Sequence, residues 1–353
     1  MNSQQADVKW KRKLLWSVLF VLIAGASVYA VIAQSRTFSL SLFASYVANA
    51  NPWYLAAAFL AMFGFIVFEG LSILLLCRAF GYRVSGVNAC FYSASDIYFS
   101  AITPSATGGQ PMCAYFMMKD GVRGVVTTIS LLINLMVYTL SILVIGLFVF
   151  ITHPSIFLKF STFSKILILL GFTVQLGFAI LFYLLLRREQ LLHRLCRWGL
   201  RVLGKLHLIR NPEKKEERLV AIFEDYRQCT ELMVGHKATV IKAFLLNLCQ
   251  RASQIMVAVF CYLATGGELK RAFDLFATQS YAVLGSNSVP IPGAMGVSDY
   301  LMLDGFSAMG YDSAAATSLE LLSRSISFYV CILLCGIAAL IKFLLIKRRR
   351  DHQ

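Results

Sequence analysis

The chain has 353 residues, of which 58% are hydrophobic and 14% are charged, and its formal net charge at pH 7 is +15. Because about a quarter of the residues in a soluble domain are charged, this composition excludes an ordinary soluble domain and indicates a membrane protein. The basic excess is concentrated in three segments that flank apolar runs, a distribution that argues against nucleic acid as a partner.

Six apolar segments are long enough to cross a hydrocarbon core about 30 Å thick, which takes about 20 helical residues. They are residues 14–33, 54–76, 125–152, 165–186, 240–265 and 323–346. The sequence KWKRK precedes the first segment, as in a signal peptide, but no cleavage site follows, so we predict a retained anchor. The nine cysteines lie mostly in apolar segments and lack zinc-ligand spacing, so no metal and no other cofactor is expected.

The basic residues also predict the orientation, because cytoplasmic loops are enriched in Lys and Arg. They cluster at 9–13, 187–242 and 347–350, whereas the connection at 153–164 has almost none. We therefore predict a multi-pass protein of the cell membrane with cytoplasmic N- and C-termini. It is expected to form a single membrane domain, 1–353. Its parts are a first half (1–186), a cytoplasmic basic connector (187–239) and a second half (240–353).

With this orientation, two regions begin and end on the same side of the membrane, each with apolar arms too short for two full spans. The arms of the first are 87–102 and 112–118, around the loop TPSATGGQP near 104–111; the second has an apolar arm at 272–289, the loop PIPGAMG at 290–296 and a moderately apolar stretch to 322. Both are predicted to be re-entrant hairpins of broken helices. The predicted fold class is therefore an all-α polytopic membrane protein, with about six full spans and two re-entrant hairpins in an inverted repeat.

Paired interrupted segments of opposite orientation are typical of transporters whose binding site lies near the middle of the bilayer. Irregular backbone at that depth must be buried in protein or line a wet cavity, so we expect the two tips to meet around a polar pocket. Gly108 and Gly109 permit positive φ and would expose successive N–H groups, which suit an anionic phosphate. The alternative is that these glycines only allow turns or close helix packing.

Ionisable residues within apolar segments need partners or water, because a charge at the bilayer centre costs about 2.5 to 3.5 kcal/mol on insertion scales. Arg251 belongs to a polar stripe at helical spacing that we expect to line a cavity. Glu320 and Arg324 are spaced to pair on one helix face, either structurally or around a substrate. The full set is Glu69, Asp96, Arg251, Asp299, Glu320 and Arg324.

The segments TPSATGGQP, MCAYFMMKDG and PIPGAMGVSD, with Arg324 in LLSRSISFYV, resemble the paired loops of one membrane family. It is the lysylphosphatidylglycerol synthase transmembrane region, a flippase-like domain that includes UPF0104-type membrane proteins. The resemblance covers nearly the whole chain. It implies an inverted repeat that moves aminoacylated or other anionic-headgroup phospholipids between leaflets and supports resistance to cationic peptide antibiotics. The matching loop residues are Pro104, Gly108, Gly109, Gln110, Pro111, Pro290, Pro292, Gly293, Gly296 and Asp299.

The chain departs from the family pattern in several places. Many members have Glu at Gln110, Gly at Ala294 and Glu at Asp299. Full-length synthases also add a soluble aminoacyl-transferase domain, which this chain is not expected to contain. We therefore do not expect phosphatidylglycerol lysyltransferase activity from this chain alone.

No enzyme motif accompanies these features, since the histidines form no H-E-x-x-H pair and Ser298 lies outside a nucleophile elbow. The leading hypothesis is a phospholipid transporter whose loop tips, with Arg251 or Arg324, hold a lipid phosphate. The first alternative is a membrane subunit or accessory factor of a separately encoded lipid-modifying enzyme. The second is synthase activity supplied by an associated transferase. The sequence leaves a homo-oligomer open.

Overall fold

The computed structural model describes residues 40–103, 108–188, 236–289 and 296–351, together with positions 194, 291 and 294. Within these ranges the chain forms helices and no β-strand, which confirms the all-α class. Several predicted features lie outside the described residues. They are the span 14–33, most of the connector 187–239, and Pro104, Pro290, Pro292 and Gly293.

Five helices are long and apolar enough to cross a membrane, and they coincide with the other five predicted spans. They are α3 (Pro52–Ala79), α6 (Gly124–Thr152), α8 (Thr162–Arg187), α11 (Lys237–Ala264) and a final helix. The final helix joins α14 (Ser313–Arg324), the π-helical segment η4 (Ser325–Val330) and α15 (Cys331–Asp351). It begins earlier than the predicted position 323 because Asp312 caps it, accepting a 2.7 Å hydrogen bond from the Ala315 N–H.

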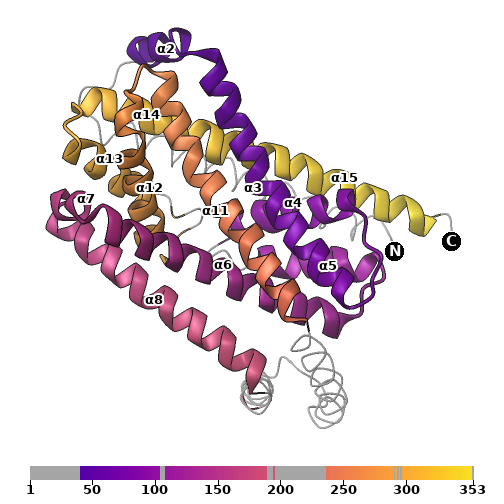
Figure 1. The fold of residues 1–353 in the computed structure, drawn as a ribbon. Coiled ribbons are helices and arrows are strands. Elements are labelled where there is room, and N and C mark those ends of the chain that lie inside the picture. The colour runs from indigo at the N-terminus through magenta and orange to yellow at the C-terminus, as the bar shows by residue number, and fades with distance from the viewer. Residues whose placement is uncertain are drawn as a thin grey trace, which may run out of the picture.

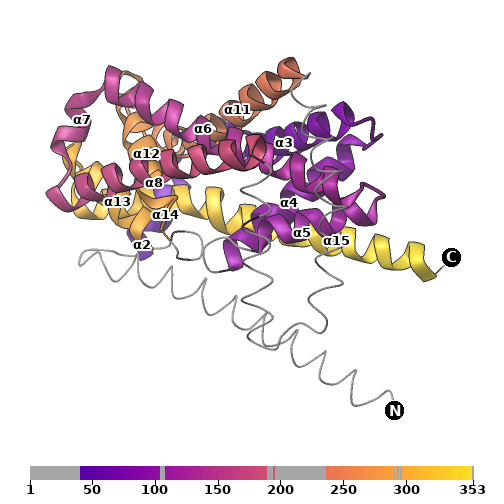
Figure 2. The same ribbon diagram turned by 90° about the horizontal axis from the view of Figure 1, so that it is seen from below.

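Two pairs of short helices occupy the predicted hairpin regions. The first pair is α4 (Gly86–Ile102) with α5 (Gly109–Lys119), and the second is α12 (Ala272–Ser286) with α13 (Val297–Ala308). At 1.5 Å per residue the longest of them, α4, extends only about 25 Å, less than a hydrocarbon core of about 30 Å. The members of each pair pack on each other, and the two pairs lie toward opposite ends of the molecule (Figure 1 and Figure 2).

The stretch up to 322 was predicted to belong wholly to the second hairpin, and that part of the prediction is wrong. The chain turns at Gly310, whose φ is +89°, and the residues from Ser313 onward belong to the final helix. The remaining short elements are α2 (Leu40–Ala48), α7 (Pro154–Lys159) and η2 (Leu269–Arg271).

The long helices α3 and α11 pack against each other along the centre of the molecule. They are antiparallel, because the Asn51 N–H just before α3 donates a 2.7 Å hydrogen bond to the Ala264 carbonyl at the end of α11. The pair α4/α5 packs on α3 and α15 through α4, while α12 packs on α6, α8 and α11. Each short pair thus contacts a long helix of the other half, an arrangement compatible with the inverted repeat, which stays a prediction.

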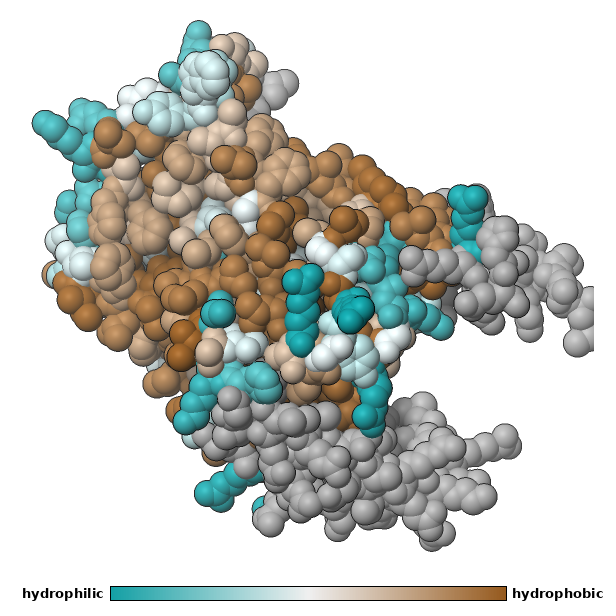
Figure 3. Space-filling view, turned by 45° about the vertical axis from the view of Figure 1, so that its right-hand side comes forward, coloured by the Kyte–Doolittle hydropathy of each residue, from teal (hydrophilic) through white to brown (hydrophobic). Residues whose placement is uncertain are grey.

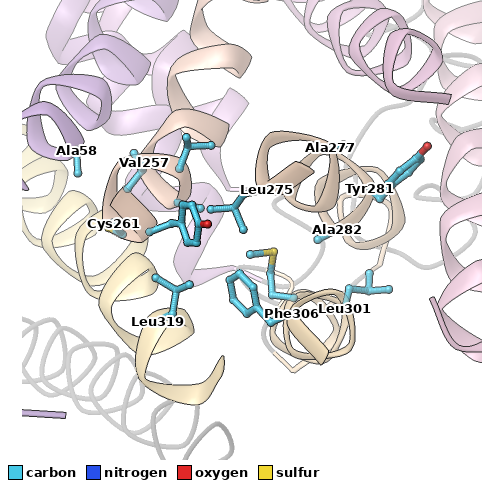
Figure 4. Close-up of a cluster of buried hydrophobic side chains, with 14 of the residues drawn as sticks. Ala58, Val257, Cys261, Leu275, Ala277, Tyr281, Ala282, Leu301, Phe306 and Leu319 are labelled. Atoms are coloured by element: carbon cyan, nitrogen blue, oxygen red, sulfur yellow. The ribbon is translucent and has the colours of Figure 1, made fainter. Parts of the chain in front are cut away.

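Apolar side chains both fill the interior and cover the outside. Leu275, Tyr281 and Phe306 lie in a buried cluster that joins α12 to α11, α13 and α14 (Figure 4). The Tyr281 hydroxyl donates to the Val149 carbonyl at 3.0 Å, so its polar atom is satisfied within the protein. Outward-facing residues such as Leu170 on α8 are exposed, and Figure 3 shows a broad hydrophobic surface with hydrophilic side chains at its margins. An apolar surface of this breadth suits lipid and not water.

The two ends of the molecule differ in charge. The basic end contains the ends of α3, α5 and α15 and the starts of α6 and α11. Its charged residues include Arg78, Arg83, Lys119, Arg123, Lys237, Lys242, Lys347 and Arg348. The mixed end contains Lys159, Lys165, Glu268, Lys270, Arg271, Asp274, Asp304 and Asp312.

Gly171 provides a test of this packing. A Cβ atom at Gly171 would lie 2.1 Å from the Leu284 carbonyl oxygen of α12, whereas a Cβ at Gly177, on the same helix, would meet nothing within 4 Å. Gly171→Ala should therefore force α8 and α12 apart and destabilise the fold by about 1–3 kcal/mol. Gly177→Ala should be neutral or stabilising by about 0.5–1 kcal/mol. Thermal unfolding in detergent measures both, and equal melting temperatures for the two variants would contradict the packing.

Candidate functional site

Buried polar side chains gather halfway along the long helices. Arg251 and Tyr138 lie near the middle of α11 and α6, about 20 Å from either end of their helices at 1.5 Å per residue. Glu69 lies in the second half of α3, and it and Arg251 are 5% and 4% exposed. The sequence analysis predicted that the polar stripe on α11 lines a cavity; Asn247, Gln250 and Arg251 are buried, and the cavity stays a prediction.

Glu69 and Asp96 form a buried pair of carboxyl groups within hydrogen-bond reach of each other. Glu69 Oε2 accepts hydrogen bonds from the Ser93 hydroxyl and the Gln250 amide, both at 3.1 Å. Asp96 accepts from the Gln110 amide at 2.7 Å and from the Ser100 hydroxyl at 3.3 Å. The donors that reach the pair are therefore neutral groups.

Arg251 has a different environment from a typical buried arginine. Its guanidinium carbon lies 3.7 Å from the centre of the Tyr138 ring, a cation–π contact, and it donates to Gln254 Oε1. Among the described residues it forms no ion pair within 4 Å, and its Nε atom is buried without a hydrogen-bond partner. A buried cation without a paired carboxylate is costly unless an anion occupies the site during function.

Side chains from both interrupted segments reach this central polar network. Gln110, on the first turn of α5, binds Asp96, and the Tyr138 hydroxyl donates a 3.0 Å hydrogen bond to Asn287 just after α12. Gln250 and Arg251, adjacent on α11, lie between these two connections. The described residues thus link the two hairpins through one set of polar side chains at mid-depth.

A second set of buried polar side chains connects three long helices. Asn247 Nδ2 donates to the Ser72 hydroxyl at 2.9 Å and to Asn134 Oδ1 at 3.1 Å, and Ser72 donates to Asn134 at 2.7 Å. These bonds join α3, α6 and α11 close to the carboxyl pair. These interhelical hydrogen bonds hold the helices around the network in register.

Arg324 forms a tight ion pair with Asp299, with 2.8 Å between Nη1 and Oδ1. Asp299 Oδ2 also accepts from the Gly296 N–H at 2.9 Å and so caps the start of α13. Glu320 lies within hydrogen-bond reach of Asp299 and interacts electrostatically with Arg324, so the three side chains form one cluster that joins α13 to α14. The π-helical segment η4 begins directly after Arg324; such segments are frequent at functional sites.

The glycines of the first loop act through close packing. Gly108 has a φ of −84°, and Gly109 is a helical residue, so the expectation of positive φ at these positions is wrong. A Cβ at Gly109 would lie 2.1 Å from Asp96 Oδ1 and 2.5 Å from the Asp96 carbonyl oxygen. The carboxyl group of Asp96 therefore lies at the start of α5, where an anion was expected to bind.

Pro111 fits the first turn of α5 because its missing N–H is not needed there. Gly296 does have a positive φ, +82°.

Sequence reasoning missed one buried ion pair, Lys342 with Asp120. Lys342 is 2% exposed and donates to Asp120 Oδ2 at 2.5 Å and to Asn88 Oδ1 at 2.9 Å. The Tyr92 hydroxyl donates to the same aspartate oxygen at 2.5 Å. These contacts fasten both arms of the first hairpin to α15. The signal available in the sequence was a lysine inside an otherwise apolar predicted span.

A separate cavity of about 230 Å³ lies between α13 and α14 at the mixed end. Its lining residues are Tyr300, Leu303, Asp304, Ser307, Ser313, Ala316 and Thr317. None of the predicted site residues lines it. Among the described residues, no group of three or more His, Cys, Asp or Glu side chains is arranged to hold a metal ion.

The comparison with protein families agrees with this architecture. The family model described as the lysylphosphatidylglycerol synthase TM region matches residues 14–335. The chain belongs to this family. It is 24% identical over 270 residues to a UPF0104 membrane protein of Archaeoglobus fulgidus, a match that covers 73% of this chain and 77% of the relative. It is also 25% identical over 130 residues to the UPF0104 membrane protein PH1989 of Pyrococcus horikoshii, covering 37% and 38% of the two chains.

The ion pair of Arg324 can be tested separately from any transport role. Arg324→Gln leaves Asp299 buried without its cation, which should cost about 3–5 kcal/mol of stability. Adding Asp299→Asn removes the orphaned charge and should recover part of that loss, although the cap on Gly296 weakens. Thermal unfolding of the two single variants and the double variant gives the coupling between them. Additive losses would show that the pair does not stabilise the fold.

Proposed function

We propose that this protein is a flippase-like transporter that moves phospholipids between leaflets, with the lipid phosphate bound at Arg251. The lipids are anionic or aminoacylated phospholipids of the lysylphosphatidylglycerol type, and their movement supports resistance to cationic peptides. Family membership supports a role with such lipids, since the family is named for the membrane region of the synthase that makes one of them. The family name does not by itself assign transport.

The observation that carries the proposal is the state of Arg251. It is buried at mid-depth, lies on the Tyr138 ring and forms no ion pair within 4 Å with a described residue, whereas Arg324 is paired with Asp299. A planar guanidinium suits a phosphate, which accepts two parallel hydrogen bonds from it. The carboxyl groups of Glu69 and Asp96 nearby suit the ammonium group of an aminoacylated headgroup. Of the two arginines weighed in the sequence, Arg251 is therefore the phosphate ligand that we propose.

The hairpins supply a route by which the site could open to each leaflet in turn. In the proposed topology the basic end is cytoplasmic, by the positive-inside rule, and α4/α5 enters from that side while α12/α13 enters from the other. The first pair is fastened at its base by Lys342 and Asp120. The second is fastened by Asp304, which accepts a 2.9 Å hydrogen bond from the Ser161 N–H before α8. Alternate release of these contacts would expose the central network to one leaflet and then the other.

The alternative is an accessory role for a separately encoded lipid-modifying enzyme, in which the central network would hold a lipid for that enzyme without moving it across the membrane. The two roles differ in a direct measurement. Purified protein in vesicles should move fluorescent phospholipid between leaflets if it is a transporter and should only bind lipid if it is an accessory factor.

Arg251→Gln should abolish this transport in reconstituted vesicles, because it removes the charge that holds the phosphate; thermal unfolding in detergent identifies folded variant protein. Lys242→Gln is the matched control: it removes a positive charge from an exposed position on the same helix and should leave transport unchanged. Leaflet exchange of fluorescent phosphatidylglycerol measures both variants. Normal transport by folded Arg251→Gln would remove Arg251 from the mechanism.

The proposed topology predicts opposite accessibility of two exposed positions, Ser155 at the mixed end and Arg83 at the basic end. A cysteine introduced at Ser155 should react with a membrane-impermeant maleimide added to intact cells, and one at Arg83 should react only after the membrane is opened. The parent protein measured alongside corrects for its native cysteines. The reverse pattern would invert the topology, and equal labelling of both positions would contradict the assignment of the two ends to opposite faces.

A further inference from the structure

Ionising both carboxyl groups of the buried pair Glu69 and Asp96 would cost free energy, because two negative charges would then share one site. The two side chains are 5% and 6% exposed and lie within hydrogen-bond reach of each other, and the described residues that donate hydrogen bonds to them are neutral Ser and Gln groups. Two carboxylates that share a buried site repel each other, and such pairs retain a proton. The pair is therefore a natural proton-binding site.

The groups that face the pair allow its charge to be counted. On the neighbouring helices they are Arg251 of α11, Tyr138 of α6, Cys113 of α5 and Cys335 of α15. Phenol and thiol groups are neutral near pH 7 even in water, so Arg251 supplies the charge among these. With one shared proton the pair carries one negative charge, which balances Arg251, and the empty site is neutral.

Two unsatisfied polar atoms beside the pair indicate that the site is made for a ligand. Gln250 donates to Glu69 and is only 1% exposed, yet its Oε1 atom has no hydrogen-bond partner among the described residues. The Nε atom of the adjacent Arg251 also has no hydrogen-bond partner among the described residues. Buried polar groups are nearly always hydrogen-bonded, and although unpartnered atoms also occur elsewhere in the described interior, these two lie beside the carboxyl pair and can bond to a ligand there.

We propose that Glu69 and Asp96 form the proton site that couples lipid transport to a proton gradient; this rests on the proposed function. A phosphate bound at Arg251 brings one negative charge into the neutral site. Uptake of a second proton, which forms an O–H bond on the remaining carboxylate, restores neutrality. Proton and anionic lipid therefore each favour binding of the other, since linkage between two sites is reciprocal. They cross together, and the proton returns to water when the lipid leaves. With an aminoacylated lipid, the ammonium group takes the place of that proton.

The transport experiment uses vesicles that contain purified protein and fluorescent phosphatidylglycerol. One proton moving with each singly charged lipid is electrically neutral. A gradient of one pH unit should therefore concentrate the lipid about tenfold in the leaflet on the alkaline side, whatever the membrane potential. The double variant Glu69→Gln/Asp96→Asn imitates the doubly protonated pair, so it should still exchange lipid but lose the accumulation, whereas each single variant keeps one carboxylate that can take up the coupled proton. Glu268→Gln, which removes an exposed carboxyl group far from the site, should behave like the parent protein.

Infrared spectroscopy of the protein in detergent measures the protonation of the carboxyl pair independently of transport. A protonated carboxyl absorption should be present at neutral pH and should be lost in both Glu69→Gln and Asp96→Asn, but not in Glu268→Gln. Absence of that absorption overturns the proton site. Lipid exchange by the parent protein that ignores the pH gradient, or that follows a sodium gradient, overturns the coupling and leaves the proposed function intact. No lipid exchange under any condition refutes the proposed function, and the coupling with it.

Discussion

The structure depends on one constraint: polar and charged groups at membrane depth must find partners inside the protein. The chain meets this constraint with separate sets of interacting polar side chains. The side chains of Ser72, Asn134 and Asn247 are hydrogen-bonded to one another. At the base of the first hairpin, Lys342 forms an ion pair with Asp120. These contacts fix the helices around them, and the network around Arg251, midway between the hairpins, contains the buried Gln250 Oε1 and Arg251 Nε atoms, which have no partner among the described residues.

The two buried arginines show how the same residue type can have different roles. Arg324 lies 2.8 Å from Asp299, which also caps α13, so its charge is neutralised and it fixes the position of the second hairpin. Arg251 has an aromatic ring where Arg324 has a carboxylate. Cation–π contact offsets part of the desolvation of a guanidinium without neutralising it. Its positive charge therefore remains available to an anion, and the neighbouring carboxyl pair sets the net charge that such an anion meets.

Much of the architecture followed from the sequence because it depends on residue properties that act locally. Apolar length predicted the spans that the structure describes, and the breaks at Gly108 and Gly296 marked the hairpins. Partners were harder to predict. Helical spacing placed Glu320 beside Arg324 but did not indicate Asp299, which is distant in sequence and pairs with Arg324. In the same way, the position of Lys342 did not indicate Asp120 as its partner. Which side chains meet depends on how helices cross, and spacing along one helix carries no information about that.

Gly109 shows why the role of a loop could not be read from its composition. Glycines before a short helix suggested backbone N–H groups open to a phosphate. In the structure the absence of a side chain at Gly109 lets Asp96 come against the start of α5, so a carboxyl group of the protein lies where the helix dipole favours an anion. A favourable helix terminus lowers the cost of an ionised Asp96, whereas its burial raises that cost. The charge of the pair is thus held between two opposing effects, which is the condition for a site whose proton can be gained and lost as a ligand comes and goes.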